Sequence, residues 1–121
     1  MIWGEDNLVM RLQQTGPGFN RAPSAYITTF DPEGKDFQLY AMGMRNPVSH
    51  QYNKDGEMFV YDSDMEFDKA TPWYRPTRIN HVVSGGEYGW RNGAGKYPEF
   101  YADNLPATLN IGPGSPTGAT F

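Results

Sequence analysis

The sequence lacks three features that would each point to a particular chemistry. It has no cysteine, which excludes disulfides, zinc–thiolate sites, covalent haem attachment and cysteine nucleophiles. No apolar run approaches the roughly 18 residues that a membrane-spanning helix needs. Basic residues number 10 against 14 acidic ones, for a net charge of −4, and they form no basic stripe. We therefore expect no transmembrane segment and no nucleic-acid partner.

Helical periodicity is missing as well, because no window sustains apolar residues at the spacing of an amphipathic helix. The composition instead includes 15% aromatic residues, 14 glycines and 10 prolines. The N-terminal residues lack the basic and apolar regions of a signal peptide, so they do not themselves indicate export. Short apolar runs among glycine and proline favour an all-β fold.

Alternating runs between turn residues predict the strands. Residues 1–23 have an irregular pattern that ends in TGPGFNRAP. Two hairpins follow, 24–30 with 36–42 around Asp31–Gly34, and 48–53 with 57–62 around Asn53–Gly56. Further strands are expected at 78–83 and 107–112, and residues 118–121 begin another.

This layout predicts part of a β-propeller, in which four-stranded sheets are repeated around an axis. Residues 43–112 would form one full blade, 24–42 the end of the preceding blade and 113–121 the start of the next. A propeller closes with typically 4–8 blades. We therefore expect the chain to be a fragment, one complete four-stranded blade with parts of two neighbours.

Five motifs in order carry a resemblance to a known family: GMRNP (43–47), DSDMEFD (62–68), PWYRPTR (72–78), RINHVVSGGEYGW (78–90) and NIGPGSPTG (110–118). Together they resemble the glucose/sorbosone dehydrogenases, and more closely a bacterial subfamily labelled membrane-bound dehydrogenases. The resemblance implies a six-bladed β-propeller that oxidises a sugar or related alcohol with pyrroloquinoline quinone (PQQ) and Ca²⁺. It also implies a periplasmic or extracellular location and a cytochrome c or other electron acceptor as partner.

By the same resemblance, Arg45 and Asn46 would contact the quinone. The catalytic base of the family lies outside this chain, and His50, which follows the turn, is a weaker candidate for a functional role. From the residues alone, Asn46 is also able to cap the turn before Pro47 while Arg45 pairs with an acid. The chain departs from the family at Val48, where a glutamine is expected, and at Thr77-Arg78, which replace an acidic pair.

Four carboxylates stand at alternate positions, Asp62, Asp64, Glu66 and Asp68. In an extended segment they would share one face and supply the oxygen ligands that Ca²⁺ prefers. The alternatives are internal salt bridges to nearby Lys69, Arg75 or Arg78, and a solvated acidic loop.

Trp73 and Tyr74 stand between Pro72 and Pro76, where their rings would stack on a sugar or quinone, or anchor the loop by burial. The segment 88–90 is expected to pack between blades. Two functions stay open: a quinone-dependent dehydrogenase, favoured by Arg45, Asn46 and the acids, and a non-catalytic exported propeller that binds carbohydrate or a partner protein. Val48 and Thr77-Arg78 favour the second.

Overall fold

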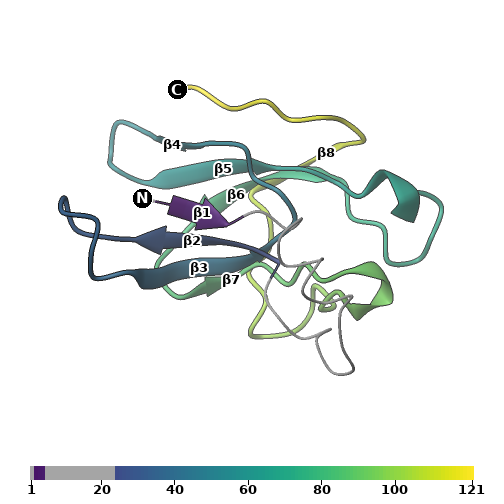
Figure 1. Cartoon of the computed structure of the whole chain (residues 1–121). Coiled ribbons are helices and arrows are strands. Elements are labelled where there is room, and N and C mark those ends of the chain that lie inside the picture. The colour runs from purple at the N-terminus through teal and green to yellow at the C-terminus, as the bar shows by residue number, and fades with distance from the viewer. Residues whose placement is uncertain (1, 5–23) are drawn as a thin grey trace.

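The computed structural model describes residues 2–4 and 24–121, and within them it contains two four-stranded sheets and no α-helix (Figure 1). The first sheet has the order β1-β2-β3-β7, with bounds Ile2–Gly4, Ala25–Thr29, Gln38–Met44 and Gly86–Glu87. The second has the order β4-β5-β6-β8, with bounds His50–Tyr52, Met58–Asp62, Thr77–Val82 and Leu109–Gly112. Two 3₁₀ turns, η1 (Glu66–Asp68) and η2 (Gly93–Gly95), lie in the loops. The prediction of an all-β fold is confirmed.

The first predicted hairpin forms as β2 and β3, which pair antiparallel. Its turn begins at Asp31, whose carbonyl accepts the N–H of Gly34 at 3.0 Å and whose carboxylate accepts the N–H of Lys35 at 2.6 Å. Gly34 has a φ of 75°, a left-handed conformation that glycine adopts without a Cβ clash. The turn residues therefore set the hairpin locally.

The second hairpin forms as β4 and β5, also antiparallel. The side-chain oxygen of Asn53 accepts the N–H of Asp55 at 3.0 Å and of Glu57 at 2.9 Å, which closes the turn. β6 then pairs with β5, and β8 pairs with β6, both antiparallel. All four strands lie within residues 43–112, where the sequence predicts a four-stranded unit.

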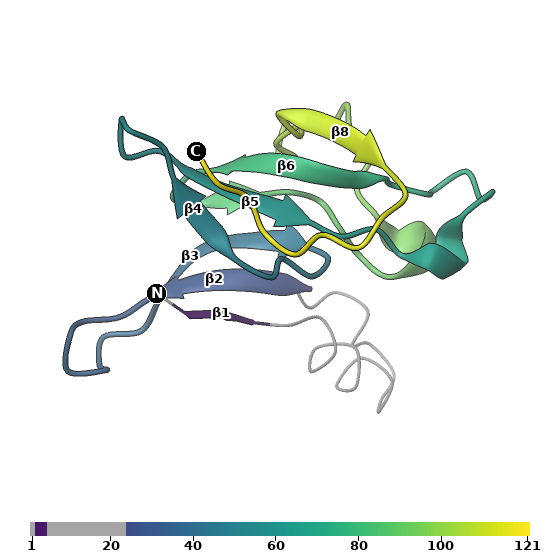
Figure 2. The ribbon, with the colours of Figure 1, turned by 90° about the horizontal axis from the view of Figure 1, so that it is seen from above.

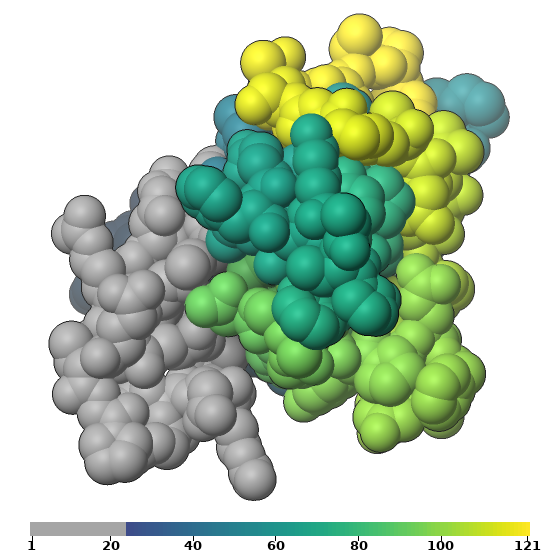
Figure 3. Space-filling view, turned by 90° about the vertical axis from the view of Figure 1, so that its right-hand side faces the viewer, coloured from purple at the N-terminus to yellow at the C-terminus, as the bar shows by residue number. Residues whose placement is uncertain are grey.

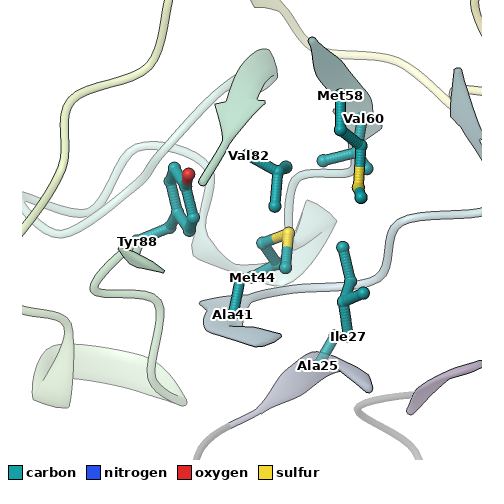
Figure 4. Close-up of a cluster of buried hydrophobic side chains, with 8 residues drawn as sticks. All are labelled: Ala25, Ile27, Ala41, Met44, Met58, Val60, Val82 and Tyr88. Carbon is teal, nitrogen blue, oxygen red and sulfur yellow. The ribbon is translucent and has the colours of Figure 1, made fainter. Parts of the chain in front are cut away.

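The two sheets lie in two layers, seen edge-on in Figure 1 and from above in Figure 2, with the core between them. In β5, buried and partly exposed residues alternate, as expected for a strand with one face covered. Figure 4 shows the facing side chains, which come from both layers. The core cluster consists of Ala25, Ile27, Ala41 and Met44 from the first sheet, Met58, Val60 and Val82 from the second, and Tyr88 after β7.

Three segments differ from the sequence prediction. Residues 2–4, expected to be irregular, form β1, while the rest of the segment 1–23 lies outside the described residues. The expected turn at 84–86 ends in β7, which pairs parallel with β3 across a long stretch of chain. Residues 118–121 form no strand. The ring of Phe121 instead packs on Phe59 at the outer face of the second sheet, with 5.2 Å between ring centroids.

Two loops leave the sheets at the same end, at the right of Figures 1 and 2. One joins β5 to β6 and contains η1, and the other joins β7 to β8 and contains η2. In the described ranges, no helix has the length and apolar character needed to cross a membrane. The loops at this end carry most of the residues that the sequence singles out.

Candidate functional site

The turn that carries Arg45 and Asn46 is held by Asp62, the first of the four carboxylates. Asp62 ends β5 and is 3% exposed. Its carboxylate accepts the backbone N–H of Arg45 at 2.9 Å and of Asn46 at 2.8 Å, and the N–H of Ser63 at 3.0 Å. An acid from a distant part of the chain therefore caps this turn through main-chain donors.

The Arg45 side chain lies along the acidic segment. One guanidinium nitrogen donates to Ser63 Oγ at 2.9 Å and the other lies 3.7 Å from Met65 Sδ. Arg45 and residues 62–65 thus meet in space, so the turn and the acidic segment form one structural unit.

The protonation of Asp62 is set by its burial. Loss of water raises its pKa from 3.8 to about 6, while the N–H groups of Arg45 and Asn46 and the charge of Arg78 act in the opposite direction. Desolvation outweighs these donors because no water reaches the carboxylate to stabilise its charge.

The other three carboxylates have separate environments. Asp64 is buried, and its Oδ2 accepts the Tyr74 hydroxyl at 2.6 Å. Burial, together with the nearby Asp64, raises the pKa of Tyr74 to about 12. Glu66 is exposed, whereas Asp68 is buried and accepts Lys96 Nζ at 2.6 Å. The shared face expected for an extended segment does not form, because η1 begins at Glu66 and turns the chain.

This arrangement does not fit Ca²⁺. Among residues 2–4 and 24–121, no three histidine, aspartate or glutamate side chains are grouped so that they could hold a metal ion. A Ca²⁺ ion takes 6–8 oxygen ligands, and here the acids bind main-chain amides, a tyrosine and a lysine instead. Asp68 does form an internal salt bridge, but its partner is Lys96 and not Lys69, Arg75 or Arg78, which the sequence suggested.

His50 begins β4, where it is opposite Val60 in the register. Its ring packs edge-on against Tyr52, with 5.7 Å between ring centroids. Burial lowers the pKa of His50. The ring therefore favours the neutral form, and its contact with Tyr52 is a packing contact.

A cleft of about 430 Å³ opens between the two loops at the right-hand end of Figure 1. Figure 3 looks onto this end, where the teal segment of the β5–β6 loop lies against the green segment that follows β7. The lining comes from two short stretches: Pro72, Trp73, Tyr74 and Arg75 on one side, and Lys96, Tyr97, Pro98 and Glu99 on the other. Sequence reasoning singled out the first stretch and missed the second, although KYPEFY repeats the combination of proline, charge and aromatic rings.

Asp68 holds the two walls of the cleft together. Its carboxylate accepts Trp73 Nε1 at 3.3 Å and Lys96 Nζ at 2.6 Å, and its carbonyl accepts the Thr71 hydroxyl at 2.6 Å. Between these contacts Ala70 has a φ of 66°, which is uncommon for a residue with a Cβ. Several contacts therefore enforce the shape of the loop that presents Trp73.

Trp73 and Tyr97 contribute the aromatic surface of the cleft. The Trp73 residue is 38% exposed although its indole N–H is bonded. The guanidinium of Arg91 covers one face of the Tyr97 ring, 4.5 Å from its centroid, and Glu87 pairs with Arg91 at 2.9 Å. Both rings are thus held in place while the cleft stays open.

Tyr88 and Trp90 are buried at 2% exposure, which agrees with their expected packing role. The N–H of Tyr88 donates to Met42 O at 3.0 Å and the N–H of Trp90 to Gly43 O at 2.7 Å. Lys96 Nζ lies 4.9 Å from the Trp90 ring centroid. This segment fixes the second wall of the cleft to the first sheet.

Comparisons with models of known protein families, with curated proteins and with solved structures find no match to this chain. The family suggested by the motifs stays a prediction, and the geometry of the cleft and of the Arg45 turn carries the functional argument.

Proposed function

We propose that this chain is part of a β-propeller that serves as a binding module for carbohydrate, with the cleft between residues 72–75 and 96–99 as its site. The observation that carries the proposal is an exposed indole, Trp73, held by Asp68 at the wall of a cleft of about 430 Å³. Small-molecule sites commonly have volumes of about 300–1,000 Å³ and aromatic walls with a few polar groups.

The cleft suits a sugar because its surface combines flat rings with hydrogen-bonding groups. The apolar face of a sugar ring packs on an aromatic face, while its hydroxyl groups need polar partners at the edge. Trp73 and Tyr97 supply rings, and Glu99 supplies an exposed acceptor on the opposite wall. Pro72 and Pro98 restrict the backbone beside them, so little order is lost when a ligand binds.

The β-propeller fold is the second part of the proposal. A four-stranded antiparallel sheet packs face to face on a second sheet, as successive blades do around a propeller axis. On this proposal the second sheet is one blade of six and the first belongs largely to its neighbour. A periplasmic or extracellular location, where polysaccharides are met, is part of the same proposal.

The test is calorimetric titration of the chain with a panel of oligosaccharides. Trp73→Ala should weaken binding by about two- to tenfold, since a stacked ring contributes about 0.5–1.5 kcal/mol. Phe67→Ala is the matched control, because Phe67 is an exposed aromatic residue of the same loop that does not line the cleft. Absence of binding to every sugar would refute the function, and equal loss in both variants would refute the site.

A second candidate is the quinone-dependent oxidation of a sugar or related alcohol. It is favoured by the bracing of Arg45 and Asn46 on one turn by Asp62. These two residues would hold PQQ, which would act as the hydride acceptor. Addition of PQQ should raise the melting temperature of the wild-type chain but not of Arg45→Met. An equal rise in both would remove Arg45 from the quinone site.

A further inference from the structure

We propose that the cleft recognises a sugar that carries a carboxylate, with Arg75 as the residue that determines this specificity. The inference rests on the proposed carbohydrate site and names the class of its ligand. It starts from the charges that line the cleft, which are two cations, Arg75 and Lys96, and one anion, Glu99.

The positive charge of Lys96 is already balanced by Asp68. Its ammonium lies 2.6 Å from Asp68 Oδ2, donates to Gly93 O at 3.0 Å and faces the Trp90 ring. The pair is buried, with side-chain exposures of 4% for Lys96 and 11% for Asp68. A ligand would have to break this pair to use the lysine.

Arg75 differs because its hydrogen bonds go to uncharged groups. Its guanidinium donates to the backbone carbonyls of Tyr88, at 3.0 Å, and Tyr97. It forms no salt bridge with any residue of 24–121. Burial and the like charge of Arg78 lower the pKa of Arg75 to about 10, although the charges of Glu99, Asp62 and Glu87 act in the opposite direction. A buried guanidinium with no carboxylate at salt-bridge distance is stabilised further by an anion that enters the cleft.

The shape of the side chain suits a carboxylate. A guanidinium has five N–H donors in a planar fork that matches the two oxygens of a carboxylate, and the carbonyls of Tyr88 and Tyr97 use only part of this set. The bound carbonyls also restrict the orientation of the guanidinium fork.

Glu99 limits the charge that the ligand can carry. It lines the same cleft with a side chain that is 64% exposed and lies 3.7 Å from Arg78. With a net charge of −4 on the chain, a densely sulfated polymer would be repelled. A uronic acid has one carboxylate for Arg75 and neutral hydroxyl groups for Glu99.

The experiment titrates the full chain with a trisaccharide that contains one galacturonic acid residue and with its methyl ester, which keeps the rings and removes the charge. The acid should bind about tenfold more tightly than the ester, from a charge-assisted pair. Raising the salt concentration from about 20 to about 500 mM should weaken binding of the acid but not of the ester.

Two variants and one competitor complete the test. Arg75→Gln should reduce the affinity for the acid to that for the ester. Because Arg75 also binds two carbonyls, Glu99→Gln at the exposed edge is the second variant. It should increase the affinity for the acid severalfold relative to the affinity for the ester. Equal affinities of acid and ester in the wild type would overturn this inference while leaving the carbohydrate site intact. If neither trisaccharide binds, and no sugar of the neutral panel binds either, the carbohydrate site itself would be overturned. Displacement of the acid by equimolar sulfate would show a simple anion site and also overturn the inference.

Discussion

Replacing Asp62 by asparagine should remove a pH-dependent loss of stability. Asp62 is buried, and its pKa in the folded chain is about 6, against an ordinary value of 3.8. Between these values the folded state binds a proton that the unfolded state has released. The stabilisation is fully present below about pH 3.8 and is lost as the pH rises through about 6. One pKa unit corresponds to about 1.4 kcal/mol, so the loss amounts to about 3 kcal/mol.

The assay is urea unfolding followed by tryptophan fluorescence at several pH values between about 3.5 and 7.5. Asp62→Asn imitates the protonated carboxyl, so its stability should lack the fall between about pH 4 and 6 that the wild type shows. Asp55→Asn is the matched control, because Asp55 lies on an exposed turn with a side chain that is 62% exposed. The difference between wild type and Asp62→Asn isolates this carboxyl from other acids that titrate in the same range.

The reasoning fails if that difference stays constant from about pH 4 to 7. It also fails if NMR titration of the Asp62 carboxyl finds a pKa below about 4. Either outcome would mean that the amide donors of Arg45 and Asn46 stabilise the carboxylate by more than burial costs it.

Two further predictions concern the contacts that shape the cleft and its supporting turn. Lys96→Met should lower the free energy of unfolding by about 3–5 kcal/mol, since it leaves Asp68 charged and buried. The additional change Asp68→Leu should recover much of that loss. Denaturant unfolding measures both variants, and a double variant as unstable as Lys96→Met would contradict the pairing. Gly43→Ala should lower the melting temperature clearly more than Gly34→Ala, as calorimetry would show. Both glycines have positive φ, 80° and 75°. A Cβ at Gly43 would overlap the Glu87 carboxylate, whereas a Cβ at Gly34 meets nothing within 4 Å. Equal shifts in melting temperature would therefore refute the steric argument.

The hairpins were predictable because their information is local. Asp31 and Asn53 close their turns with bonds to residues at most four positions away, and alternation along β5 marks its buried face. The same reasoning failed for β7 and for residues 118–121. β7 pairs with a strand more than 40 residues earlier, and Phe121 packs across the outer face of a sheet. Neither interaction leaves a pattern in neighbouring residues.

The candidate sites divide in the same way. An all-β chain could be predicted from the residues alone, which also drew attention to Arg45, the four acids and Trp73. What each acid binds became clear only from the fold. Asp62 meets the amide of Arg45 across 17 positions, and Asp68 meets Lys96 across 28. A carboxylate can bind a metal, an amide or an ammonium, so the identity of the residue alone does not decide which of these it binds. The choice depends on which donors the packed sheets bring to it and on how much water they exclude. For that reason the cleft between residues 72–75 and 96–99 exists only in the folded chain.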